Sequence, residues 1–321
     1  MIACLACAVV SPASSVSLTT MRLSASLIKN LGGFKTVEEL RRSGFYADYG
    51  ERIESLLRTP QMHTCPGARP LLRSFLRIAQ WNIEKGKHFD AILDRLRKDD
   101  ILKWADILLL NEADCGMIRS RNRHVALDLA QALGMHMAFA PAHIELTKGI
   151  DEERFLEGEN QESLQGNAVL SRYPMTEARV VTLPATYEPY ESEEKRYGRR
   201  NCLWVRIRLD RSFLWVGSTH LELRNTPLCR ALEMRHIMEN LPGSAFDAHV
   251  LGGDWNTNTF RRGTSWRMLK SIFRILCSPA ERTRKKLLHP DEGPEPLFLC
   301  FGNPAFPGRS LTPMRRRLAP K

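Results

Sequence analysis

An acid and an amide lie two positions apart in the segment Gly252-Gly253-Asp254-Trp255-Asn256-Thr257. The segment follows Ala248 to Leu251, a short apolar run that predicts a buried strand ending at the two glycines. Side chains alternate in direction along a strand, so Asp254 and Asn256 are expected to point to the same side. A carboxylate there can hold a water molecule, and an amide can hold a phosphoryl oxygen. The pattern indicates chemistry on a phosphate ester; a Gly-Gly-Asp turn followed by an uninvolved Asn is the alternative.

Four other polar motifs also follow apolar runs. They are Gln80-Trp81-Asn82-Ile83-Glu84, Leu110-Asn111-Glu112, Gly166-Asn167-Ala168-Val169-Leu170-Ser171-Arg172 and Ser218-Thr219-His220-Leu221-Glu222. In this order and spacing the five motifs resemble the endonuclease/exonuclease/phosphatase superfamily, from about Arg77 to Thr257. The resemblance implies hydrolysis of a phosphate ester by in-line attack of water, with Mg²⁺ as the cofactor and Mn²⁺ as a substitute.

Two residues are expected at the metal. A carboxylate at a strand end suits Mg²⁺, which prefers a few protein oxygens and keeps several waters. The resemblance makes Glu112 the principal magnesium ligand and places Asn82 near the metal and the phosphate. The alternatives are a plain surface acid for Glu112 and a turn-forming residue for Asn82.

Three residues are expected in catalysis. The resemblance implies that His220 donates to a non-bridging phosphoryl oxygen and that Asn256 donates to an oxygen on the pentacoordinate phosphorus. It also implies that Asp254 orients or activates the attacking water. Such donors matter because phosphoryl transfer depends mainly on positioning and on neutralising developing charge.

Three residues are expected to bind substrate. Asn167 and Arg172 lie in a segment that the family uses near its site, and Arg200 can contact phosphate through its fork of N–H groups. The alternatives are a strand start for Asn167, an exposed basic side chain for Arg172 and an exposed basic turn for Arg200.

The carboxyl end departs from the family pattern. The family has an Asp near a final strand and then a Ser-Asp-His motif whose histidine helps to generate the nucleophile. Here no Asp or Glu follows Glu295 and no His follows His289. His289-Pro290-Asp291 is a poor replacement, because it is typical of a helix-terminating turn. The expectation is therefore an incomplete fold at this end. It leaves open a catalytically impaired or truncated member that binds phosphate or polyanions.

Strands and helices alternate along the chain in the order that a layered α/β arrangement requires. Phe89, Ile92, Leu93 and Leu96 recur at helical spacing, and a second helix over Val125 to Leu133 closes at Gly134. Further strands are expected at 107–110, 136–140, 167–171, 178–183, 202–209 and 213–219, and a third helix at 228–241. The resemblance implies a four-layer α/β/β/α sandwich of two mixed sheets flanked by helices.

Composition bounds the organisation and the partners. The expected domains are a helical or partly disordered extension over 1–70, the catalytic domain over 71–298 and a basic tail over 299–321. The net charge of +11 suits a polyanion, so nucleic acid is one candidate substrate. No stretch is long and apolar enough to span a membrane. The eight scattered cysteines indicate isolated thiols in the cytoplasm, and a monomer is expected. Secretion is the alternative if residues 1–20 form a signal peptide.

Overall fold

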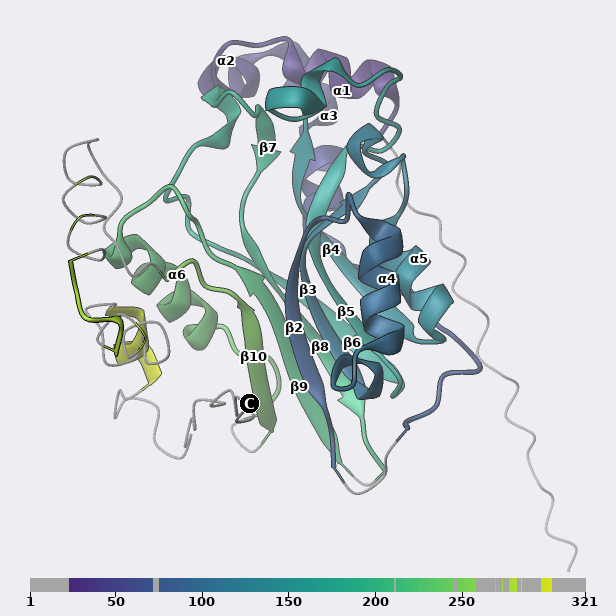
Figure 1. The fold of residues 1–321 in the computed structure, drawn as a ribbon. Helices are drawn as coiled ribbons and strands as arrows, with labels where there is room; N and C mark the ends of the chain where they lie inside the picture. Colours follow the sequence, from purple (N-terminus) through teal and green to yellow (C-terminus); the bar gives the residue numbers. More distant parts are fainter. Residues whose placement is uncertain are drawn as a thin grey trace, which may run out of the picture.

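Two β-sheets pack face to face between outer layers of helices in the computed structural model (Figure 1). The structure describes residues 23–71, 75–210, 212–244, 247–257, 277–281 and 296–301, together with Leu269, Phe273 and Arg284. The described residues contain six α-helices. The predicted α/β sandwich of two mixed sheets is confirmed. The segment His289-Pro290-Asp291 and most of the expected tail lie outside the described residues.

The larger sheet has six strands in the order β1-β4-β5-β3-β2, with β7 also paired to β4. Its bounds are β1 Gln61–His63, β2 Ile78–Lys85, β3 Ile107–Cys115, β4 His136–Glu145, β5 Leu164–Ser171 and β7 Arg196–Gly198. Strands β2 and β3 run parallel, and the other pairs run antiparallel.

The smaller sheet has four strands in the order β10-β9-β8-β6. Its bounds are β6 Met175–Thr182, β8 Asn201–Arg208, β9 Phe213–His220 and β10 Ala248–Asp254. Strands β8 and β9, both expected from the sequence, pair as an antiparallel hairpin, whereas β10 runs parallel to β9. The parallel pair matters for the site, because the carboxyl ends of β9 and β10 reach the same edge of the sheet.

Three helices cover the outer faces of the sheets. Helices α4 (Phe89–Lys98) and α5 (Val125–Leu133) lie on the larger sheet, and α6 (Pro227–Glu239) lies on the smaller one (Figure 1). Gly134 ends α5 in the left-handed conformation, with φ of 63°, as its place in the sequence predicts. In α6 the side chain of Thr226 accepts from the backbone N–H of Cys229, and Pro227 occupies the first turn.

Three more helices precede the first strand. They are α1 (Ala25–Gly32), α2 (Val37–Arg42) and α3 (Gly44–Arg58). The hydroxyl of Thr36 accepts from the backbone N–H of Glu39 at 3.1 Å, which caps the start of α2. Leu31, Leu40 and Ile53 have no exposed area and join the same apolar cluster as α4, α5 and the larger sheet. These helices are therefore packed on the main body of the protein.

The core consists of three apolar layers. One lies between the larger sheet and its helices, a second lies between the sheets, and a third lies between the smaller sheet and α6. Ile107, Leu109, Val169, Val205 and Val216 belong to the layer between the sheets. Burying this layer holds the two sheets together, at roughly 1.5–3 kcal/mol for each large side chain removed from water.

The strands extend further than local patterns predict. β3 runs five residues past Leu110, and β4 runs five residues past Ala140. Between β4 and β5 the chain contains a short 3₁₀ helix, Asp151–Phe155. Within the described residues, no helix has the length and apolar content to cross a membrane. Cys65, Cys115, Cys202, Cys229, Cys277 and Cys300 are all free thiols.

Candidate active site

Four strand ends from both sheets deliver polar side chains to one place. Asn82 lies near the end of β2, and Glu112 lies near the end of β3. His220 ends β9 and Asp254 ends β10, and the parallel register sets these two residues side by side. The site is therefore shared between the larger sheet, which supplies Asn82 and Glu112, and the smaller sheet, which supplies the other two.

Asn82 links the two carboxylates. Its amide nitrogen donates to Glu112 Oε1 and to Asp254 Oδ2, both at 3.0 Å. Its amide oxygen accepts from the backbone N–H of Glu84 at 3.0 Å. An amide nitrogen cannot bind a cation, and the amide oxygen of Asn82 points to the backbone of Glu84. In this arrangement Asn82 therefore holds the two acids in place and is not itself a metal ligand.

Glu112 has an unusual backbone conformation. Its φ of 56° is left-handed, and the pairing of β3 with β5 shifts register between Leu110 and Ala113. Such a bulge redirects a side chain out of the regular alternation of a strand. Left-handed backbone at a residue other than glycine costs on the order of 1 kcal/mol and clusters at functional sites. The side chain of Glu112 keeps 23% of its area exposed, so it can still contact a ligand.

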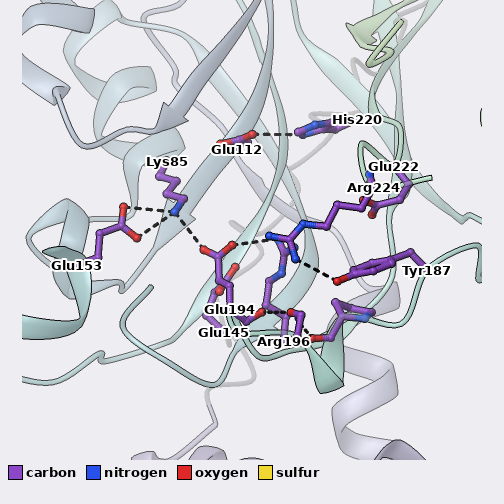
Figure 2. Close-up of polar contacts among 12 residues, drawn as sticks. Lys85, Glu112, Glu145, Glu153, Tyr187, Glu194, Arg196, His220, Glu222 and Arg224 are labelled. Carbon is purple, nitrogen blue, oxygen red and sulfur yellow. Dashed lines mark hydrogen bonds and ion pairs between the residues drawn. The ribbon is translucent and has the colours of Figure 1, made fainter. Parts of the chain in front are cut away.

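His220 lies between the two acids. Its Nδ1 lies 3.8 Å from Glu112 Oε1, and its Nε2 lies 3.8 Å from Asp254 Oδ2 (Figure 2 shows the first pair). Burial lowers the pKa of His220 well below its usual value, and repulsion from Arg200 and Arg196 lowers it further. The imidazole is thus neutral at pH 7, with one N–H to donate. Among the described residues Nδ1 has no hydrogen-bond partner, which leaves it available to a ligand.

Asp254 and Asn256 form a small turn. The backbone N–H of Asn256 donates to Asp254 Oδ1 at 3.0 Å, so Oδ1 is fixed and Oδ2 faces Asn82 and His220. The amide nitrogen of Asn256 donates to the carbonyl of Leu221 at 2.7 Å. One of its two N–H groups is thereby used, and the other is what Asn256 can offer a substrate. The φ of Asn256 is 50°, the second left-handed backbone in the site.

A small hollow of about 200 Å³ opens beside these residues. Its lining consists of Glu112, Ala142, Gln165, Gly166, Asn167, Arg200 and His220. Nε of Arg200, one of these lining residues, lies 3.3 Å from Glu222 Oε2. The guanidinium of Arg200 and the imidazole of His220, which both line the hollow, can offer N–H donors to an anion there.

The chain has a recognisable family. The model of the Endonuclease/Exonuclease/phosphatase family matches residues 79–306, most of the chain. The chain belongs to this family. No curated protein sequence matches it. Members of the family are metal-dependent phosphoesterases.

Several solved structures are similar to this chain. An endonuclease/exonuclease/phosphatase from Beutenbergia cavernae is 21% identical, with a TM-score of 0.41 over 63% of this chain. The chain spans 52% of that protein, about half its length. The human Nocturnin catalytic domain with bound sulfate is 17% identical, with a TM-score of 0.40 over 62% of this chain and 68% of that one. A family protein from Leptotrichia buccalis is 15% identical, with a TM-score of 0.39 over 62% of this chain and 74% of its own.

The donor set fits a hard divalent cation of the kind this family uses. Glu112 and Asp254 are partly exposed, at 23% and 33% of their side chains, and Asn82 holds them together. Among the described residues, no cluster of three or more His, Cys, Asp or Glu forms a metal cage. A cage is not required, because Mg²⁺ is commonly held by one or two carboxylates and several waters. A zinc site of the usual His and Cys ligands does not fit these residues.

Asn111 is a residue of the site to which the sequence assigned no role. Its amide nitrogen donates to Asn167 Oδ1 at 2.8 Å and to the carbonyl of Thr219 at 3.1 Å. Its amide oxygen accepts from the backbone N–H of Asp254 at 2.9 Å and from Gln80 at 3.0 Å. The side chain has no exposed area, so it joins the two sheets directly beneath the acids. The signal was its place in the motif beside Glu112.

Asn167 reaches the hollow but is committed elsewhere. It lines the hollow, and its amide nitrogen donates to Asn201 Oδ1 at 2.9 Å and to the Asn201 carbonyl at 3.0 Å. Asn201 in turn donates to the carbonyl of Pro141 at 2.8 Å. Asn167 is thus brought to the site, as predicted, within a buried amide network that also fixes the start of β8.

Arg172 does not join the site, and this corrects the expectation from sequence. Its guanidinium donates to the carbonyls of Ala105 and Leu133 at 3.2 and 3.3 Å. Its backbone N–H donates to Asp106, just before β3 begins, whereas Glu112 lies near the other end of β3. Arg172 directly follows β5, whose last residue, Ser171, pairs with Ile107 at the start of β3. The antiparallel pairing therefore places Arg172 at the opposite end of β3 from Glu112.

A buried ion cluster supports the ends of β2 and β3. Nε of Arg119 lies 2.8 Å from Asp114 Oδ2, and its Nη1 lies 2.9 Å from Glu194 Oε1. Nζ of Lys85 lies 3.0 Å from both Glu153 and Glu194 (Figure 2). Lys85 follows Asn82 by three residues, and Asp114 follows Glu112 by two. The cluster, named below the Arg119 cluster, therefore ties the 147–163 segment to the two strands that carry the site.

Glu145 also belongs to the Arg119 cluster, since its Oε1 lies 3.5 Å from Nη2 of Arg119, and its pKa shift is opposite to that of Glu194. Arg196, Lys85 and Arg119 outweigh the effect of burial and lower the pKa of Glu194 to about 2. At Glu145 burial is the largest effect and raises the pKa to about 7, although Arg119 and Arg196 oppose it. Neither carboxyl oxygen of Glu145 has a hydrogen-bond partner among the described residues, which is why burial prevails there.

Proposed function

We propose that this protein is a metal-dependent phosphoric ester hydrolase that acts by in-line attack of water. The observation that carries the proposal is the convergence of Asn82, Glu112, His220 and Asp254 at contact distance from four separate strand ends. Asn82 and Asp254, which are hydrogen-bonded, lie 172 positions apart in the sequence. The fold does not require two partly exposed acids at this place, nor a His220 Nδ1 that has no partner among the described residues.

Each residue has a role that its geometry supports. Glu112 holds the cation, with Asn82 keeping Glu112 and Asp254 in place. Asp254 Oδ2 faces the centre of the site and orients the attacking water, taking up its proton. His220 donates its N–H to a non-bridging phosphoryl oxygen, and Asn256 donates its remaining N–H beside it. Fixed donors of this kind stabilise charge that develops in the transition state without reorganising at that moment.

The cofactor is Mg²⁺, with Mn²⁺ as a substitute. When bound, the cation neutralises phosphoryl charge and stabilises the leaving oxygen. The substrate is a phosphate ester, with nucleic acid a candidate because the chain carries a net charge of +11. Arg200 and Asn167, which line the hollow, are the substrate-binding residues.

The same contacts also fit a protein that binds phosphate or a polyanion without cleaving it. The specific observation in favour is the net charge of +11, which suits a polyanion. The two proposals differ in turnover and share the binding of metal and phosphate.

The test combines a turnover assay with a binding assay. Purified protein is incubated with Mg²⁺ and bis-p-nitrophenyl phosphate, beside Glu112→Gln, Asp254→Asn and the exposed control Glu157→Gln. We expect both site variants to lose roughly a hundredfold or more in rate and the control to match wild type. Binding of inorganic phosphate with Mg²⁺ is measured in parallel by titration calorimetry.

The outcomes separate the two readings. If wild type releases no more nitrophenol than Glu112→Gln, the hydrolase proposal fails for this chain. If phosphate still binds in a Mg²⁺-dependent way, and Glu112→Gln abolishes that binding, the binding function is the correct one. If neither rate nor binding depends on Glu112, both are wrong.

A further inference from the structure

A second hollow adjoins the first and is used by none of the roles above. It has a volume of about 250 Å³ and shares Arg200 with the first hollow. His143 from β4 and Arg199, next to Arg200, line it, as do Thr186, Tyr187 and Glu222. The first hollow includes Ala142, the neighbour of His143, so one stretch of β4 serves both. Two small adjoining hollows indicate two small groups on one substrate.

Two side chains of the second hollow carry nitrogen atoms to which the described residues supply no hydrogen bond or ion pair. His143 is buried, at 2% exposed, and its Nδ1 has no hydrogen-bond partner among the described residues. A buried polar atom without a partner is costly, so it indicates a group that is satisfied by a ligand. Arg199 is exposed, and within the described part of the chain its guanidinium makes no ion pair. The backbone N–H of Arg199 donates to the carbonyl of Ala142 at 2.9 Å, which fixes its place at the rim.

The two acids that line the second hollow, Glu222 and Glu233, already accept hydrogen bonds from other residues. Glu222 accepts from Arg200 at 3.3 Å and from the backbone N–H of Arg224 at 2.9 Å. Glu233 accepts from the hydroxyl of Thr186 at 2.5 Å and from the backbone N–H of Glu222 at 3.0 Å. Burial raises the pKa of Glu233, so this acid is less readily charged than an ordinary one. Glu222 thus faces Arg200, and no carboxylate among the described residues pairs with the Arg199 guanidinium.

The surroundings of His143 indicate the same sign of charge. After burial, Arg196 and Arg200 are the largest causes that lower the pKa of His143, because their charges repel a proton there. Tyr187 forms one wall, and its hydroxyl accepts from Arg224 at 3.1 Å, as Figure 2 shows. The exposed Arg199 guanidinium, close to a His143 Nδ1 that has no partner among the described residues, suits an anion with several acceptor oxygens rather than a neutral polyol.

We propose that this second hollow binds a second phosphoryl group of the substrate, held by Arg199 and His143, while the first hollow holds the phosphate that is hydrolysed. The inference rests on the proposed function for the identity of the first group. The substrate class is thus an ester that carries another phosphate close to the scissile one. Arg200, which lines both hollows, lies between the two groups, and Arg199 determines the preference for the doubly phosphorylated substrate.

The test compares matched ligands that differ by one phosphate. The hydrolysis substrates are thymidine 5′-(p-nitrophenyl phosphate) and its 3′-phosphorylated form. The binding ligands are thymidine 5′-monophosphate and thymidine 3′,5′-bisphosphate, titrated by calorimetry with Mg²⁺ present. The variant is Arg199→Gln, and the control is Arg208→Gln, an exposed arginine at the other end of β8.

Wild type is expected to favour the second phosphate about tenfold, in Kd and in kcat/KM, because a charge-assisted hydrogen bond is of that size. Arg199→Gln removes the preference and leaves the rate on the singly phosphorylated ester unchanged, while Arg208→Gln keeps the preference. Equal affinity of wild type for both ligands, or an Arg199→Gln protein that keeps the ratio, overturns the inference. If neither nitrophenyl ester is hydrolysed but the binding ratio behaves as expected, the hydrolase proposal fails and the second phosphate site stands.

Discussion

The amide oxygen of Asn111 accepts a hydrogen bond of 2.9 Å from the backbone N–H of Asp254. This contact joins β3 of the larger sheet to β10 of the smaller one, directly behind the two acids. The position of Asp254 relative to Glu112 therefore depends on a fully buried amide as well as on the apolar layer between the sheets.

Replacing Asn111 with Ala should cost both stability and activity. The change leaves the Asp254 N–H and the Thr219 carbonyl without their partner, and each such buried group costs about 1–3 kcal/mol. We expect the free energy of unfolding, measured by urea denaturation, to fall by about 3 kcal/mol. The control is Asn30→Ala, at an exposed residue of α1. A loss no larger than that of the control would show that Asn111 does not join the sheets.

Asn82→Asp should make the fold depend on divalent cations. The new carboxylate would lie beside those of Glu112 and Asp254, where the amide nitrogen now lies 3.0 Å from each. Repulsion among three acids should lower stability by about 1 kcal/mol in EDTA, or roughly 2–4 °C in Tm. Millimolar Mg²⁺ should raise Tm more in this variant than in wild type. The matched control is Asn30→Asp, and a Mg²⁺ shift equal to that of wild type contradicts a cation site here.

The pH dependence of stability should change in Glu145→Gln. The folded-state pKa of Glu145 is about 7, above its ordinary 4.5, so between these values the folded state binds more protons than the unfolded chain. The contribution of Glu145 is therefore fully present below about pH 4.5 and is lost as pH rises toward 7, by at most about 1.4 kcal/mol per pH unit. Glutamine mimics the neutral acid and should not show this loss.

The measurement is the difference in urea midpoint between wild type and Glu145→Gln at pH 5 and pH 8. The variant should gain on wild type as pH rises, while Glu157→Gln, an exposed site, should track wild type. Parallel profiles for wild type and Glu145→Gln would mean that Glu145 is charged in the folded protein. Below pH 4.5 Glu194 acts in the opposite direction, because its pKa is lowered to about 2 and its stabilisation is lost as pH falls toward that value.

Gly253→Ala should disrupt the end of β10. The φ of Gly253 is 152°, and an added Cβ would lie 1.8 Å from the carbonyl oxygen of Thr219, a backbone atom that cannot easily move. We expect a loss of several kcal/mol, seen as a lower Tm or as insoluble protein. Gly67→Ala is the control, since nothing lies within 4 Å of its added Cβ. A Gly253→Ala protein with wild-type Tm would contradict the close approach of β9 and β10.

Local signals predicted the parts of the fold that local interactions determine. The 3.6-residue spacing of Phe89, Ile92 and Leu96 gave α4, and Gly134 gave the end of α5. These helix features are readable because apolar spacing and caps act within a few residues. The sandwich of two mixed sheets was instead implied by the family resemblance that the five motifs carry, and the structure brings Asn82, Glu112, His220 and Asp254 to one place.

What depends on register between distant strands was not readable. Arg172 follows Asn167 by only five residues, yet the antiparallel pairing of β5 carries it to the other end of the sheet. The left-handed backbone of Glu112 and the bulge beside it arise from pairing with β5, which no local pattern encodes. The partners of Glu153 in the 147–163 segment, Lys85 and Arg119, likewise come from distant parts of the chain.

The division of the acids between two sheets has a consequence for how the protein loses its activity. A fluctuation that parts the sandwich along its middle would pull Glu112 away from Asp254 while every helix and every hairpin remained intact. Inactivation on warming should then precede any change in far-ultraviolet circular dichroism. A ligand that bridges Glu112 and Asp254 should hold the two sheets together and so slow amide hydrogen exchange in β3 and β10 together.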